Sequence, residues 1–160
     1  MPELVTERVC AEVEGEVVVF LIGMRINKLW KVWKWVPVVV AMPRMLKELA
    51  AHPELGMLSA RPLFGLRNLS VIQYWKSAEH LQAYARASNQ THLPAWQAFN
   101  RTIGTDGDVG IWHETYVVPQ GHAESVYVNM PRYGLGLAGT LFPAKGQRAT
   151  ASKRLARTKT

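Results

Sequence analysis

The stretch that decides the fold runs from Asn68 to Val118 and contains YWKSAEHLQAYARAS (Tyr74–Ser88), HLPAWQAF (His92–Phe99) and GIWHETYVV (Gly110–Val118). Its first and last parts are rich in β-branched and aromatic residues, which is typical of strands. The middle has apolar residues at helical spacing. The stretch therefore predicts a strand, helical segments and a second strand.

The boundaries of these elements follow from local signals. We expect strands at Asn68–Trp75 and Val109–Val118. Ser77 is a favourable N-cap for a helix over Ala78–Ala87, with His80 at the capping-box position that Glu or Gln normally holds. A second helical piece is expected over about Leu93–Thr102, because Pro94 suits a first turn.

Three more elements are expected before this stretch. Glu16–Ile26 is β-branched and apolar, which predicts a buried first strand. Val38–Ala51 has an apolar stripe at helical spacing, with Pro37 or Pro43 expected in its first turn because proline is costly inside a helix. Met57–Phe64 reads as a strand that forms a hairpin with the next one.

The predicted order is β-α-β-β-α-β, with a short extra strand at Ser125–Asn129 and a glycine-rich loop from Pro131. This order is that of the α+β class with a ferredoxin-like fold. Two helices would cover one face of its antiparallel sheet. The other apolar face must also be covered, and a second copy of the chain is the expected cover.

The 160 residues fit one domain, for which we expect an N-terminal arm at 1–15, a ferredoxin-like α+β domain at 16–143 and a basic disordered tail at 144–160. The net charge is +7, but six cations lie in the last sixteen residues without an acid. We interpret them as a solvated tail, with loose binding to nucleic acid or anionic lipid as the alternative. No specific nucleic-acid partner is expected.

The composition restricts the function further. Cys10 is the only cysteine, so a disulfide within the chain and a cysteine metal cluster are excluded, and a reducing, cytoplasmic setting is expected. The longest apolar run, Val17–Ile22 with Gly23 and Met24, is too short to span a membrane. No signal peptide and no His–carboxylate cluster with metal-ligand spacing are visible, so no metal site is predicted.

His113 is the first candidate functional residue. Strand alternation puts it on one face with Ile111, and puts Glu114 on the other. Because this strand is apolar on both faces, we expect it to be buried on both and His113 to lie in a core or a cavity. Two interpretations stay open: a hydrogen-bonded histidine at a dimer interface, or a pocket histidine that takes a substrate proton or binds iron.

His92 is the second candidate, since it shares a helix face with Trp96. It is either a hydrogen-bonded structural histidine or a pocket ligand or base. Arg25 and Asn27 end the first strand and could orient a carbonyl or an enolate. A set of aromatic residues is either core or the lining of a pocket for a hydrophobic substrate, namely Trp75, Tyr84, Trp96, Trp112 and Tyr116.

Several segments, over roughly residues 16–135, resemble a known group of proteins: RINKLWKVWKW (Arg25–Trp35), YWKS (Tyr74–Ser77), GIWHETY (Gly110–Tyr116) and VYVNMP (Val126–Pro131). The chain resembles the dimeric α+β barrel superfamily of antibiotic-biosynthesis monooxygenases. It resembles more closely a largely uncharacterised family grouped with a fungal terpenoid-pathway monooxygenase. The resemblance implies a homodimeric barrel that oxidises a hydrophobic small molecule without flavin or nicotinamide.

In such enzymes the deprotonated substrate can itself react with O₂. His113 would then be the first choice for binding or removing the proton, His92 the second, with Arg25 and Asn27 as oxyanion partners. Haem-degrading relatives place an aromatic residue and an iron-ligating histidine at positions similar to Tyr84 and His92. Two alternatives therefore remain: a haem enzyme, monooxygenase or aldoxime-dehydratase-like, with His92 or His113 on iron, and a non-catalytic ligand-binding dimer.

Overall fold

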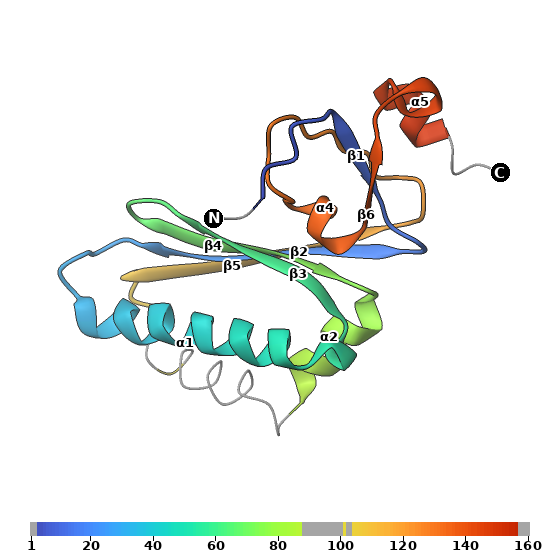
Figure 1. Cartoon of the computed structure of the whole chain (residues 1–160). Coiled ribbons are helices and arrows are strands. Elements are labelled where there is room, and N and C mark those ends of the chain that lie inside the picture. The colour runs from blue at the N-terminus through green and yellow to red at the C-terminus, as the bar shows by residue number, and fades with distance from the viewer. Residues whose placement is uncertain (1–2, 88–100, 102–103, 157–160) are drawn as a thin grey trace.

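A computed structural model describes residues 3–87, 101 and 104–156 of the chain. The elements in chain order are β1 Val9–Glu12, β2 Val17–Ile26, α1 Val32–Ala51, β3 Met57–Phe64, β4 Asn68–Trp75, α2 Ala78–Arg86, β5 Val109–Val118, α4 Leu135–Ala138, β6 Thr140–Pro143 and α5 Ala151–Ala156 (Figure 1). Short 3₁₀ turns lie at Pro53–Leu55 and Gly146–Arg148. The predicted helical piece at Leu93–Thr102 falls almost wholly outside the described residues.

Four strands form one antiparallel sheet in the order β3-β4-β2-β5. Helix α1 connects β2 to β3, and α2 follows β4, so the connections are those of a βαββαβ unit. Both helices cover the same face of the sheet (Figure 1). The predicted α+β, ferredoxin-like fold is therefore confirmed, and the predicted bounds of β3, β4 and β5 match those observed.

The central strand β2 has a near-continuous apolar sequence because side chains from both of its faces pack into apolar clusters. On the helix side, Val18 packs with Leu49 of α1 and Trp75 of β4, and Met24 and Ile26 form a second cluster. On the opposite side, Val17 packs against residues from both chain ends. Alternating residues of one strand thus serve two cores.

Helix α1 begins at Val32, six residues before the predicted start at Val38, and both Pro37 and Pro43 lie inside it. The prediction of a proline in the first turn is wrong. The inward residues Trp35 and Val38 pack against the Met24 cluster. We attribute the longer helix to this packing, which offsets the backbone hydrogen bonds that two prolines remove.

The start of α2 agrees with the prediction. The Ser77 hydroxyl accepts a hydrogen bond from the His80 backbone N–H at 3.3 Å, as an N-cap does. The His80 ring also lies within hydrogen-bonding distance of this hydroxyl, with Nδ1 2.8 Å from Oγ. The histidine therefore supports the cap from the position where a capping box has Glu or Gln.

The two chain ends form a second small layer on the far face of the sheet, to which the segment predicted as an N-terminal arm contributes a strand. β1 pairs with β6 in a two-stranded antiparallel sheet, with Val9 opposite Pro143. The expected strand at Ser125–Asn129 contributes only an isolated bridge between Tyr127 and Val9. Local sequence could not reveal this pairing, because its partners lie more than 100 residues apart.

The predicted loop from Pro131 and the predicted disordered tail are likewise corrected for the described residues. The segment includes α4, β6 and α5. Arg148 forms a bidentate ion pair with Glu12 of β1, with Nε–Oε1 and Nη2–Oε2 distances of 2.6 and 3.1 Å. Gly139 passes so close to the Glu12 carbonyl that a Cβ would clash there. Cations that looked solvated in the sequence thus bind acids of a distant segment.

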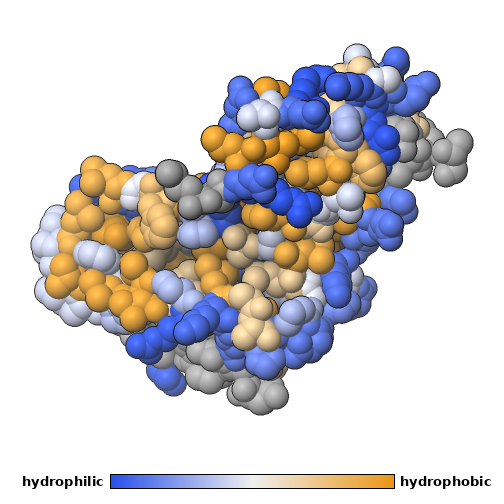
Figure 2. All heavy atoms as spheres, in the orientation of Figure 1, coloured by the Kyte–Doolittle hydropathy of each residue, from blue (hydrophilic) through white to orange (hydrophobic). Residues whose placement is uncertain are grey.

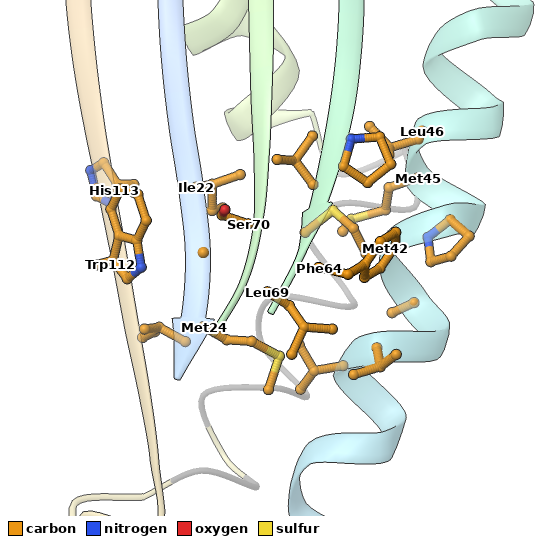
Figure 3. Close-up of a pocket in the computed structure, with 18 of the residues that line it drawn as sticks. Ile22, Met24, Met42, Met45, Leu46, Phe64, Leu69, Ser70, Trp112 and His113 are labelled. Carbon is orange, nitrogen blue, oxygen red and sulfur yellow. The ribbon is translucent and has the colours of Figure 1, made fainter. Parts of the chain in front are cut away.

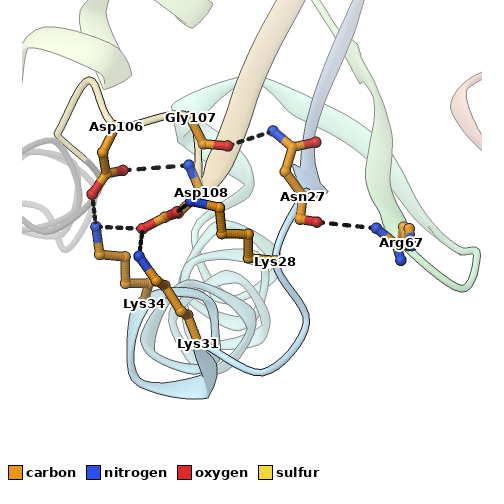
Figure 4. A network of polar contacts seen from close by, with 8 residues as sticks. All are labelled: Asn27, Lys28, Lys31, Lys34, Arg67, Asp106, Gly107 and Asp108. Carbon is orange, nitrogen blue, oxygen red and sulfur yellow. Dashed lines mark hydrogen bonds and ion pairs between the residues drawn. The ribbon is translucent and has the colours of Figure 1, made fainter.

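A fully buried carboxylate, Asp108, joins the start of α1 to the start of β5 (Figure 4). Lys28 lies 2.6 Å and Lys31 2.5 Å from its two oxygens, and Lys34 lies 3.0 Å away. Lys34 also pairs with Asp106. The lysines, Lys28 first, hold the pKa of the Asp108 carboxyl well below its ordinary value although burial opposes this.

Within the described residues, no helix is both long enough and apolar enough to cross a membrane. This agrees with the expectation from the apolar run at Val17–Ile22.

Replacement of Asp108 by Asn is expected to lower the urea midpoint at pH 7, because three lysines lose their shared carboxylate. The folded pKa is depressed, so the stabilisation exists above the unfolded pKa of about 3.9 and disappears as pH falls through the folded pKa. The difference in unfolding free energy between wild type and Asp108→Asn should therefore shrink below about pH 4.

Asp106→Asn is the matched control, because the Asp106 side chain is 48% exposed. We expect a clearly smaller change in the urea midpoint for this variant. Equal midpoints for the two variants would contradict the role assigned to Asp108.

Candidate functional site

A cavity of about 510 Å³ lies between α1 and the helix-covered side of the sheet (Figure 3). Strands β2, β3, β4 and β5 all contribute to its wall. The residues that line it are Ile22, Gly23, Met24, Lys34, Pro37, Val38, Val39, Ala41, Met42, Pro43, Met45, Leu46, Pro62, Phe64, Leu69, Ser70, Val71, Ile111, Trp112 and His113. A volume of this order suits a small organic molecule.

The wall is mostly apolar and includes three methionines, Met24 from β2 and Met42 and Met45 from α1. Met42 and Met45 are three residues apart, so they share a face of α1 with Leu46. The sequence shows this stripe as a helix face, but only the fold shows that it lines a cavity. Unbranched methionine side chains adapt to ligands of different shape.

His113 lies on β5 opposite Ile22 of β2, and it is a cavity-lining residue. Its ring centroid is 5.8 Å from that of Phe20. The expectation that β5 is buried on both faces is wrong in the single chain. β5 is an edge strand, and its residues from Ile111 to Val117 are exposed. His113 therefore sits at the border of the cavity and not within a core.

Trp112, on the opposite face of β5, lies directly over Gly23 of β2. A Cβ at Gly23 would be 2.7–2.9 Å from the Trp112 indole, so only glycine leaves room for the ring in this position. Both residues border the cavity, and Figure 3 labels Trp112. Packing of the Trp112 ring thus explains why a glycine occupies the middle of this apolar strand.

Arg25 and Asn27 do not line the cavity in the described structure. Arg25 donates a hydrogen bond to Asn68 Oδ1 at 3.2 Å. Asn27 Nδ2 donates to the carbonyl of Gly107 at 3.0 Å, and the Asn27 carbonyl accepts from Arg67 (Figure 4). The structure thus places Asn27 next to the Asp108 cluster, and neither residue lines the cavity with His113.

Trp75 and Tyr84 are core residues of the helix-covered face. Trp75 is fully buried and its indole N–H donates to Gln73 Oε1 at 2.9 Å. Its ring centroid is 5.7 Å from that of Tyr84. Burial, followed by Glu48, raises the pKa of the Tyr84 phenol, which therefore stays protonated at neutral pH. Both line a small void of about 50 Å³ behind the main cavity.

Tyr116 lies on the same face of β5 as Trp112 and Glu114, away from the helices. Its hydroxyl donates to Glu114 Oε2 at 2.7 Å, and this hydrogen bond raises the pKa of the phenol. It is 52% exposed. Of the five aromatic residues predicted for the pocket, the structure brings only Trp112 to the cavity wall, while His92 and Trp96 fall outside the described residues.

Among the described residues, no group of three or more His, Cys, Asp or Glu side chains is arranged to hold a metal ion. Cys10 is buried in β1, on the far side of the sheet from the cavity. Within this part of the chain, His113 is the one imidazole on the cavity wall.

These features define a ferredoxin-like α+β protein with an apolar cavity between its first helix and its sheet. Residues 17–135 match the Monooxygenase af470-like family, which is most of the chain, and the chain belongs to this family. The match covers the whole four-stranded sheet and both of its covering helices.

One curated relative is Monooxygenase af470 of Aspergillus fumigatus, which is 30% identical over 132 residues, or 72% of this chain and 44% of the relative. The chain therefore spans less than half the length of that protein. Family membership places the chain among the Monooxygenase af470-like proteins, but it does not by itself define a substrate or a reaction.

Solved structures share the fold at low identity. Aldoxime dehydratase, in complex with butyraldoxime, superposes with a TM-score of 0.70 at 17% identity and covers 84% of this chain and 40% of its own. SnoaB, a cofactor-independent oxygenase from Streptomyces nogalater, has a TM-score of 0.47 at 13% identity and covers 66% and 95%. These identities bear on the fold alone.

Substitution of Gly23 by Ala is expected to push the Trp112 indole away from the sheet and toward solvent, because the added Cβ would overlap it. Tryptophan emission should shift to longer wavelength, and the shift should disappear in a Trp112→Phe background. Gly110→Ala is the matched control on the same sheet face, since its nearest atoms would be 3.9 and 4.0 Å away. An unchanged spectrum for Gly23→Ala would contradict the packing described.

Proposed function

We propose that this protein is a monooxygenase that binds a hydrophobic small molecule in the cavity between α1 and the sheet. The observation that carries the proposal is an apolar cavity of about 510 Å³ with a single imidazole, His113, on the described part of its wall. Family membership supports oxygen chemistry. A polar group at the border of an apolar cavity is the common arrangement for orienting a substrate.

The apolar side chains would bind the body of the substrate. Met42, Met45 and Leu46 cover one side of the cavity from α1, and Met24 and Leu69 cover the other from the sheet. Because binding expels water from these apolar side chains, the cavity favours a largely hydrophobic ligand. It also excludes water from the reacting carbon, which protects a reactive carbanion from reprotonation.

His113 would act as the base. A substrate with an acidic C–H next to a phenol or carbonyl would lose that proton to the imidazole, and its carbanion would then react with O₂. One oxygen atom forms a C=O bond at this carbon, the other leaves as water, and the substrate supplies the electrons. A CH₂ group thus becomes C=O, and neither flavin nor nicotinamide is required.

The cavity would also accept a haem whose iron is bound by His113, the one imidazole on the described part of its wall. Such an iron would supply oxygen or oxime chemistry. We keep this possibility as an outcome of the experiment below, together with simple ligand binding without catalysis.

His113→Gln should lower oxygen consumption with an anthrone-type substrate by about 10²–10⁴-fold, which is the usual contribution of a general base. Ligand binding, followed by quenching of tryptophan fluorescence, should change only severalfold. His122→Ala is the matched control, because His122 is an exposed histidine that does not line the cavity.

Two results would overturn the assignment. If His113→Gln consumes oxygen at the wild-type rate, His113 is not the base. A Soret band that forms on haem addition and is lost in His113→Gln would favour the haem enzyme, and binding without any oxygen uptake would leave a non-catalytic ligand-binding protein.

We also propose that the chain is a homodimer that closes a barrel through the uncovered part of the far sheet face. The terminal layer covers Val17, Tyr74 and Val118 at one end of this face. Farther along β5 on this face, Tyr116 and Trp112 are 52% and 42% exposed. An apolar sheet face of this kind is usually covered by another protein surface.

Sedimentation should therefore give twice the chain mass of 18.0 kDa at micromolar concentration. Tyr116→Asp should convert the protein to a monomer, because it would bury a charge in the contact. Leu155→Asp, at an exposed position on α5, should leave the dimer intact. A monomeric wild type would contradict this assembly.

A further inference from the structure

The end of the molecule at which α1 begins carries bulky apolar side chains that no other part of the described chain covers. Trp30 and Trp33 are 67% and 63% exposed, and in the hairpin between β3 and β4 Phe64 and Leu66 are 76% and 88% exposed. Figure 2 shows hydrophobic residues gathered at this end of the molecule, on the left of the view. We call these four residues the apolar tip.

The apolar tip is continuous with the outer face of α1. Trp33, Val36 and Val40 have the i, i+3, i+7 spacing of one helix face, and Val36 and Val40 are 40% and 47% exposed. Trp35 differs from its neighbours, since it is turned inward and its indole donates to the Leu29 carbonyl at 3.0 Å. The first half of α1 is thus apolar toward the core and also toward solvent, which a helix with one buried face does not require.

The charge around the tip is positive. Residues 17–47 contain six cations and no acid. Three of these cations, Lys28, Lys31 and Lys34, pair with only two acids of the loop before β5, Asp106 and Asp108, so the cluster keeps a net positive charge. Arg25 and Arg67 instead donate to amide oxygens, and Arg44 and Lys47 are exposed on the outer face of α1.

We propose that the apolar tip docks on an anionic phospholipid bilayer. Tryptophan with leucine or phenylalanine, flanked by lysine and arginine, is the combination that favours the membrane interface. The tip is formed by a hairpin turn and the start of a helix, which project at one end of the fold (Figure 1) and can insert between headgroups. The surrounding cations complement anionic lipids.

Docking in this orientation would also open the cavity toward the bilayer. Phe64 belongs both to the tip and to the cavity wall, and the exposed Pro37 lines the cavity from α1. A hydrophobic substrate could then pass from the lipid phase into the cavity without crossing water. This second part rests on the proposed function, whereas docking itself does not.

The test is flotation of the whole chain with vesicles of phosphatidylcholine and with vesicles of equal parts phosphatidylcholine and phosphatidylglycerol. Wild type should float with the anionic vesicles, more weakly with neutral ones, and less at high salt. The triple variant Trp30→Ser, Trp33→Ser, Leu66→Ser should bind at least about tenfold more weakly, because its apolar side chains no longer insert. None of these three residues lines the cavity.

Val126→Ser, Val128→Ser, Leu137→Ser is the matched control, since these are also exposed apolar residues, at 43%, 46% and 44%, but belong to the terminal layer. This control should float like wild type. With a water-soluble substrate the tip variant should turn over at the wild-type rate, and with a vesicle-borne substrate its rate should fall at least about tenfold, in line with its binding.

Three outcomes would overturn the docking proposal: wild type that does not float with either vesicle, a tip variant that floats as well as wild type, or a tip variant that sediments at half the wild-type mass. The last would show that the tip is a contact between two copies. Flotation of wild type without turnover of any substrate would support docking and reject the proposed function, so the two failures are distinguishable.

Discussion

The ionised carboxylate of Asp108, held without solvent contact by three lysines, is the constraint on which the geometry of this protein depends. It fixes the start of α1 to the start of β5, the two elements that approach the cavity from opposite sides. Charges that are buried need partners with good geometry, so this arrangement tolerates little movement. Asn27 and Gly107 tie the end of β2 to the same point.

The four-stranded sheet contributes to three parts of the molecule: the core, the cavity and the outer surface. Its inner face forms the core with Trp75 and Leu49, and farther along it opens into the cavity. Its outer face is partly covered by the terminal layer. There the guanidinium carbon of Arg61, from β3 of the sheet, lies 3.5 Å from the centre of the Tyr133 ring, which belongs to the terminal layer. The remainder, with Trp112, stays open. The cavity and the open face meet at the edge strand β5, which presents His113 to one and Trp112 to the other.

Two apolar surfaces are therefore left exposed among the residues that the structure describes, and they differ in character. The open sheet face carries Glu114 and Tyr116 beside Trp112, and this mixture of polar and aromatic side chains suits a second protein surface. The apolar tip has tryptophan and leucine among cations and suits a lipid interface. Together they would place the cavity of each subunit between a partner chain and a membrane.

The sequence by itself determined the periodic elements of the sheet. The bounds of β3, β4 and β5 and the Ser77 cap depend on local alternation and on a side chain that reaches its own backbone. For the same reason the separation of His113 from Glu114 could be predicted, because it needs only the period of a strand. The methionine stripe of α1 was also visible, but its role as a cavity wall was not.

Only the tertiary structure decided what covers each face. That β5 is an edge strand depends on the sheet order, and that β1 pairs with β6 depends on chain ends more than 100 residues apart. Lysines 28, 31 and 34 look like a solvated charge run until the fold brings Asp108 to them. The periodicity of a sequence predicts which side chains are buried. It does not predict which segment covers them, because that segment is often distant in the sequence.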